Sequence, residues 1–140
     1  MKIIELKKAP KNKIGKLNKN GVDLKPHEER TAELLTLYGF NVEAIRPSNI
    51  PKIKNPDILM MGTVWEMKGP TNSNASTIKK RFRKSIKQAD GKGIFDLRNI
   101  KTTKEQKDAF DTIIELFETS RGMRRIIVIE DSDKVLDIFK

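Results

Sequence analysis

The chain has 140 residues and a formal net charge of +10, with a single histidine and no cysteine. This length predicts one domain with a sizeable core. The lack of cysteine excludes disulfides, thiolate nucleophiles and thiolate metal sites, and a single histidine excludes a two-histidine ribonuclease mechanism. No apolar run approaches the roughly 20 residues of a membrane span, so we expect no transmembrane segment.

The positive charge is concentrated in two segments. Residues 1–25 hold eight lysines against Glu5 and Asp23, and residues 79–87 hold six basic residues and no acid. The rest of the chain is close to neutral. A polyanionic partner such as nucleic acid is one interpretation of this distribution, and a solvated lysine-rich surface is the other.

The first half of the chain predicts one helix followed by three strands, with a further short strand near the N-terminus. Residues 1–25 show no clear hydrophobic period, and we interpret them as a basic N-terminal arm or linker with a short strand over 2–6. Pro26 suits the first turn of a helix that ends before Gly39. A strand over 41–46 and a proline-rich connection follow. Strands over 57–61 and 63–68 then form a hairpin with Gly62 at the turn.

The second half alternates helices and strands. A loop over 69–75 leads into a basic helix that Ser76 caps and that ends near Ala89, and a strand over 94–97 follows. Thr102 or Thr103 caps the next helix, and strands over 125–129 and 135–139 complete the chain. This order predicts an α/β (α+β) domain over residues 26–140, with a central mixed sheet flanked by helices.

The hairpin carries the strongest candidate for a catalytic site. Asp57 follows Pro56 at the start of one strand, and Glu66 and Lys68 lie on the next. Because side chains alternate along a strand, Glu66 and Lys68 share one face while Trp65 takes the other. Two carboxylates beside a lysine can hold a divalent cation and activate water against a phosphodiester. The alternative is an ordinary cross-strand ion pair on a solvent face.

The helix from Pro26 offers a third acid. Glu28 shares its helical phase with Ala32 and Leu35, the face that packs on the sheet, whereas Glu29 lies on the wet face. We therefore place Glu28 in the catalytic site, with complementing the positive helix N-terminus as the alternative role. His27 lies near the rim, where a capping or surface role is favoured over acid–base catalysis.

The basic helix presents a buried stripe and a positive face. Ile78, Phe82, Ile86 and Ala89 recur at helical spacing and predict core packing. The opposite face suits contacts with nucleic-acid phosphates, through Lys79, Lys80, Arg83, Lys84 and Lys87. Gln88 is a candidate for orienting phosphate or water, or else a surface amide. Thr71 is a candidate phosphate contact. The alternative is that it belongs to an ordinary polar loop.

These motifs resemble the PD-(D/E)xK nuclease superfamily through Glu28, Pro56-Asp57 and Glu66-Met67-Lys68. A longer string is similar to the C-terminal tRNA-cleaving domain of contact-dependent growth inhibition (CdiA-type) toxins. That string includes residues 27–33, 39–42, 55–58 and 65–71, and the likeness continues through 88–90 and 96–98. The resemblance covers about residues 25–140.

The resemblance implies a metal-dependent endonuclease with a PD-(D/E)xK-like core that cleaves tRNA. Asp57 and Glu66 would bind the cation, usually Mg²⁺. Lys68 would position the attacking water or stabilise the phosphorane, and Glu28 would support a water or a second metal. An immunity protein becomes a candidate partner. The site of action would be the cytoplasm of a target cell, reached as part of a larger toxin or mobile element, with a free-standing mobile-element or phage protein as the alternative.

Two other functions stay open from the residues alone. A DNA endonuclease of the same fold would show the same charge pattern, because both polymers present the same phosphates. A non-catalytic nucleic-acid-binding module would keep the basic helix. It would have no need for the acids at Glu28, Asp57 and Glu66, which repel phosphate unless a cation lies between them.

Overall fold

The computed structural model describes residues 1–140 and contains three α-helices and one eight-stranded sheet. The helices are α1 (Pro26–Leu37), α2 (Ala75–Ala89) and α3 (Thr103–Thr119), with 3₁₀ turns η1 (Lys11–Lys13), η2 (Leu97–Asn99) and η3 (Asp131–Asp133). The strands are β1 (Lys2–Glu5), β2 (Leu17–Asn18), β3 (Val42–Ala44), β4 (Ile58–Met60), β5 (Thr63–Lys68), β6 (Lys92–Asp96), β7 (Arg125–Glu130) and β8 (Lys134–Phe139).

The strands follow the order β1-β8-β7-β6-β5-β4-β3-β2 across the sheet. The central strands β5, β6 and β7 are parallel, because α2 and α3 serve as the crossover connections between them. The hairpins β4–β5 and β7–β8 extend the sheet antiparallel on either side. The expected central mixed sheet flanked by helices is confirmed.

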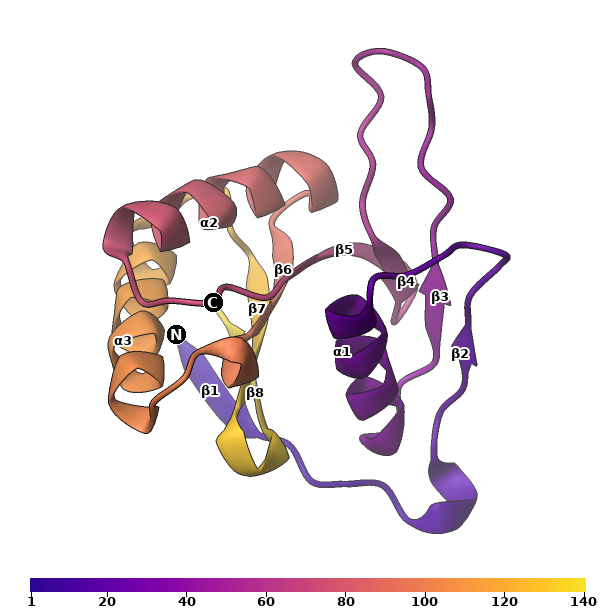
Figure 1. Ribbon diagram of the computed structural model, residues 1–140, viewed down its shortest axis with the longest axis horizontal. Helices are drawn as coiled ribbons and strands as arrows, with labels where there is room; N and C mark the ends of the chain where they lie inside the picture. The colour runs from indigo at the N-terminus through magenta and orange to yellow at the C-terminus, as the bar shows by residue number, and fades with distance from the viewer.

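Helices cover both faces of the sheet, which gives three layers (Figure 1). On one face α2 and α3 pack through a cluster that includes Phe82 and Phe117. On the other face α1 packs through Ala32 and Leu35 against a cluster that contains Trp65. None of these helices combines the length and the apolar character needed to cross a membrane.

Residues 1–25, which we interpreted as a basic arm or linker, contribute two short strands to the sheet. The expected short strand is present as β1, which pairs antiparallel with β8 at one edge. The second strand, β2, pairs parallel with β3 at the other edge. Every residue of β1 is exposed. Its sequence, Lys2-Ile3-Ile4-Glu5, does not alternate between apolar and polar residues, so the sequence gives no sign of its place in the sheet.

Two local details around the hairpin and α2 follow from capping and turn chemistry. Met61 and Gly62 adopt φ values of 54° and 71°, the left-handed pair typical of a two-residue hairpin turn. The N-cap of α2 is Asn74, not Ser76 as expected. Its side-chain oxygen accepts the N–H groups of Ser76 and Thr77 at 3.0 and 3.2 Å.

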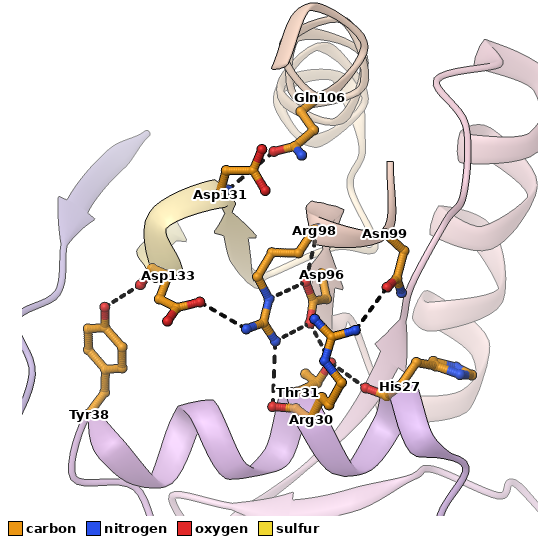
Figure 2. A network of polar contacts seen from close by, with 10 residues as sticks. All are labelled: His27, Arg30, Thr31, Tyr38, Asp96, Arg98, Asn99, Gln106, Asp131 and Asp133. Atoms are coloured by element: carbon orange, nitrogen blue, oxygen red, sulfur yellow. Dashed lines mark hydrogen bonds and ion pairs between the residues drawn. The ribbon is translucent and has the colours of Figure 1, made fainter. Parts of the chain in front are cut away.

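A polar network joins α1 to the C-terminal ends of β6 and β7 (Figure 2). At its centre Arg98 donates to both carboxylate oxygens of Asp96, at 2.9 and 2.7 Å, and to Asp133 at 3.0 Å. Thr31 on α1 donates to Asp96 at 2.6 Å, and the Tyr38 hydroxyl donates to the backbone oxygen of Asp133. Burial acts to raise the pKa of Asp96, but hydrogen bonds from Arg98 and Thr31 outweigh it and lower that pKa.

Candidate active site

A cavity of about 320 Å³ lies where the loop before β4, strand β5, the start of α1 and one side of α2 meet. It brings together the four predicted catalytic residues, Glu28, Asp57, Glu66 and Lys68. Among the other predicted site residues, it is also lined by His27, Lys84 and Gln88. These residues come from four separate elements, so the cavity exists only in the folded chain.

The hairpin places Asp57 opposite Glu66. Ile58 pairs with Trp65 in the antiparallel register, which puts the preceding Asp57 across from Glu66. The Asp57 backbone N–H donates to the carbonyl of Trp65 at 3.1 Å. Its carboxylate accepts the backbone N–H of Met67 at 2.7 Å. Asp57 is therefore anchored at both its backbone and its side chain.

Glu66 is buried, with 4% of its surface exposed, and its pKa is raised to about 8. Burial contributes most to this shift, and a hydrogen bond and charge repulsion with Asp57 add to it. Lys68, whose ammonium lies 3.2 Å from Oε2 of Glu66, acts in the opposite direction. The other oxygen, Oε1, is buried without a hydrogen-bond partner. The carboxylate pair thus favours binding a proton or a cation.

The start of α1 closes one side of the cavity. Glu28 lines it and also accepts the backbone N–H of Lys25 at 3.1 Å, a contact at the N-terminus of α1. His27 is exposed at the rim, as expected, beside Gly69. No three or more histidine, aspartate or glutamate side chains are arranged to hold a metal ion. A cation would therefore rest chiefly on the Asp57–Glu66 pair.

The predicted nucleic-acid contacts are divided between the cavity and the outer face of α2. Of these residues only Lys84 reaches the carboxylate cavity. A separate hollow of about 490 Å³ on the helix is lined, together with Ser76, by Lys79, Lys80, Arg83, Lys84 and Lys87. Thr71 is exposed and does not line the carboxylate cavity.

Gln88 has a defined structural contact. Its side-chain oxygen accepts the backbone N–H of Asn55 at 2.7 Å, which ties α2 to the residue two positions before Asp57. Asn55 in turn accepts the backbone N–H of Ser48 at 2.8 Å through its side chain. The loop that contains Asp57 is therefore held by a hydrogen bond to α2 and by a hydrogen bond within the loop, between Ser48 and Asn55.

Five residues that line the cavity were not among the predicted site residues: Lys25, Asn55, Met67, Gly69 and Arg81. Helical phase carried a signal for Arg81, because Thr77, Arg81, Lys84 and Gln88 recur at spacings of four, three and four along α2. Asn55 precedes Pro-Asp in a loop, and nothing in the local sequence predicts its contact with Gln88, 33 residues away.

A larger hollow lies elsewhere. It has a volume of about 690 Å³ and is bordered by β2, β3 and the β4–β5 turn. Glu43 is its sole acid, and Lys16 its sole base. Because it lacks a pair of acids, we place the chemistry in the smaller cavity, where carboxylates and cations converge.

Comparisons with known proteins agree with this architecture. The structure is similar to a solved chain described as "CdiA-CT/CdiI toxin and immunity complex from Burkholderia pseudomallei", with a TM-score of 0.67 and 18% sequence identity. The similarity covers 89% of this chain and 98% of that chain, and at this identity it shows a shared fold. None of the curated proteins compared with this chain matches it. Residues 54–135 match the family profile described as contact-dependent growth inhibition CdiA C-terminal domain. Because this match spans more than half of the chain, the protein belongs to the family of contact-dependent growth inhibition CdiA C-terminal domains.

Proposed function

We propose that this protein is a metal-dependent endoribonuclease of the PD-(D/E)xK type that cleaves tRNA as the toxic domain of a growth-inhibition system. The observation that carries the proposal is the convergence of Asp57, Glu66 and Lys68 in one cavity, beside the basic side of α2. A binding module has no use for two adjoining acids next to a phosphate-binding surface. A phosphodiesterase uses such acids to hold a cation.

The residues of the cavity fit a divalent cation. Glu66 has a buried oxygen without a partner, and burial, together with the neighbouring Asp57, raises its pKa to about 8. Carboxylate oxygens are ligands that Mg²⁺ prefers, and Mg²⁺ commonly keeps several waters and uses only one or two protein carboxylates. A bound cation would supply Lewis-acid activation of the phosphate and of its attacking water.

The residues around the cavity would then have different roles. Asp57 and Glu66 would hold the cation, with Asp57 oriented by the N–H of Met67. Lys68 would donate from its ammonium to a non-bridging phosphate oxygen, where it stabilises the negative charge that develops during attack. Glu28 would accept a hydrogen bond from a water at the α1 side of the cavity. The lysines of α2 would bind flanking phosphates without reading bases.

The assignment of tRNA as substrate rests on the resemblance of residues 27–33, 55–58 and 65–71 to tRNA-cleaving toxin domains. Family membership supports delivery into a target cell as part of a larger protein, with the cytoplasm as the site of action. The solved relative is described as a toxin and immunity complex, and this supports a cognate immunity protein as the partner of this domain.

The test is incubation of the purified protein with total tRNA, and in parallel with linear and supercoiled DNA, each with Mg²⁺ or EDTA. We expect discrete tRNA fragments with Mg²⁺, none with EDTA, and a loss of at least about 10³-fold for Glu66→Gln. Glu118→Gln removes the same charge from an exposed position of α3 and serves as the control. Cleavage of DNA alone would assign DNA as the substrate, and binding without cleavage would refute the nuclease proposal.

A further inference from the structure

A hollow that we call the second hollow adjoins the carboxylate cavity along α2. It differs from the two larger hollows described above. It has a volume of about 340 Å³ and shares three of its residues with the cavity. No acid and no hydrophobic residue lines it. Its lining consists of Lys68, Thr77, Lys80, Arg81 and Lys84. Lys68 pairs with Glu66, but Lys80, Arg81 and Lys84 have no acid in this lining, so the hollow carries a positive potential that favours an anion.

Arg81 is the residue that most requires such an anion. Its Nε atom is buried and has no hydrogen-bond partner, and Arg81 takes part in none of the molecule's ion pairs. A buried guanidinium nitrogen without a partner carries a desolvation cost. In contrast, Arg98 and Arg125 each pair with a carboxylate. The chain itself supplies no partner for the Nε atom of Arg81.

Arg81 and Glu66 both have a buried side-chain atom without a hydrogen-bond partner. The two buried side-chain atoms that lack a hydrogen-bond partner are Oε1 of Glu66 and Nε of Arg81, and both residues line the carboxylate cavity. One atom suits a cation and the other suits an anion. Lys68 and Lys84 also border both hollows, so the cavity and the second hollow are adjacent.

We propose that this second hollow is a phosphate-binding subsite that holds the backbone phosphate next to the cleaved one. Arg81 reaches from this subsite toward the scissile phosphate. This assignment rests on the proposed nuclease function and extends it to a contact outside the carboxylate site. Phosphate suits the site because guanidinium donors pair with phosphate oxygens in a fork geometry, and the ammonium groups of Lys80 and Lys84 add charge.

The first test uses the helix itself as an internal control. Thr77→Asp places a negative charge in the hollow, whereas Ala75→Asp places one in the same first turn of α2 but outside the hollow. Acids in the first turn favour a helix, so both variants are expected to fold. We expect Thr77→Asp to weaken tRNA binding about 10-fold or more, and Ala75→Asp by less than about 2-fold. Equal effects of the two variants would refute the subsite.

The second test measures the dependence of tRNA affinity on salt. Removing one phosphate contact with Arg81→Gln should reduce the slope of log K against log salt by about 0.7 to 0.9. Arg81→Lys should restore most of that slope because it returns the charge. Arg121→Gln, which removes a charge from an exposed position outside both hollows, should leave the slope unchanged. A parent-like slope for Arg81→Gln would overturn the proposal.

These binding tests are separable from the test of cleavage. If the parent binds tRNA but cuts nothing, the nuclease proposal fails while the slopes still decide whether the subsite exists. If the parent cleaves and Arg81→Gln matches it in both slope and single-turnover rate, the subsite fails while the nuclease proposal stands. If the parent binds no nucleic acid, both proposals fail.

Discussion

Gln88 accepts a hydrogen bond from the backbone N–H of Asn55 at 2.7 Å, so the last turn of α2 holds the loop that carries Asp57. The same helix also supplies Arg81 and Lys84 to the cavity. The position of Asp57 and the positions of the cationic side chains in the cavity are therefore coupled through one helix. This coupling gives a test of positioning that is separate from chemistry.

Gln88→Met should lower the rate of tRNA cleavage about 10-fold while leaving the protein folded. The variant keeps the side-chain length but leaves the N–H of Asn55 without its acceptor, at a cost of about 1–3 kcal/mol in stability. Gln88→Glu keeps an acceptor and should retain more of the stability, as measured by thermal unfolding. A parent-like rate for Gln88→Met would show that this contact does not position Asp57.

The stability of the protein without divalent cations should fall as the pH rises from about 4.5 to about 8. In this window the unfolded chain has released the Glu66 proton, whereas the folded chain retains it because its pKa is raised. The folded state therefore binds more protons, and raising the pH favours unfolding. Other groups titrate in the same range, so the relevant quantity is the difference between the parent and Glu66→Gln.

Urea denaturation in EDTA at a series of pH values measures this difference. The parent should lose stability relative to Glu66→Gln as the pH rises, and the loss should level off above pH 8. Adding Mg²⁺ at the high end should restore stability to the parent alone, since a bound cation stabilises the folded state by mass action. Parallel curves for the two proteins would show that the Glu66 proton does not affect folding.

Lys80→Ala combined with Lys84→Ala should weaken tRNA binding and flatten its salt dependence by about 1.4 to 1.8 in slope, for two lost phosphate contacts. The matched control is Lys104→Ala with Lys107→Ala, two exposed positions of α3. The Lys107–Asp111 ion pair is solvent-exposed, so the control should cost little stability. If both double variants change the slope equally, binding depends on overall charge and not on the face of α2.

Arg98→Met should destabilise the fold by about 3–5 kcal/mol, because it leaves the buried carboxylate of Asp96 without its ion-pair partner. Arg98 also links Asp96 to Asp133 and thereby joins the ends of β6 and β7 to α1 (Figure 2). Adding Asp96→Asn should recover part of the loss, since the buried charge is then removed. Chemical denaturation of the three variants measures these values, and a change below about 1 kcal/mol would contradict this account.

Local patterns predicted the helices and the β4–β5 hairpin well. Pro26, Gly39 and the period of Ala32 and Leu35 define α1, while the stripe of Ile78 and Phe82 defines the buried side of α2. The hairpin follows from its two apolar runs and Gly62. These features depend on interactions between residues close in sequence, and helix and strand periods report such interactions directly.

The place of residues 1–25 depended on partners far along the chain. Lys2 pairs with Phe139, and Leu17 pairs with Val42, so the two short strands are stabilised by edges that form only when the rest of the sheet is complete. Their side chains are largely exposed and follow no apolar alternation. Without knowledge of these strand pairs, a lysine-rich stretch of this kind is interpreted as a linker.

For the candidate site, the sequence by itself determined which side chains the hairpin offers: Asp57, Glu66 and Lys68, at spacings set by the strand period. It also determined the charge of α2. Only the tertiary structure decided that Arg81, and not the more exposed Lys79 or Arg83, faces the carboxylates, and that Gln88 holds the loop before Asp57. The physical reason is that a strand or helix period assigns a residue to a face. Which neighbours that face meets depends on how the layers pack.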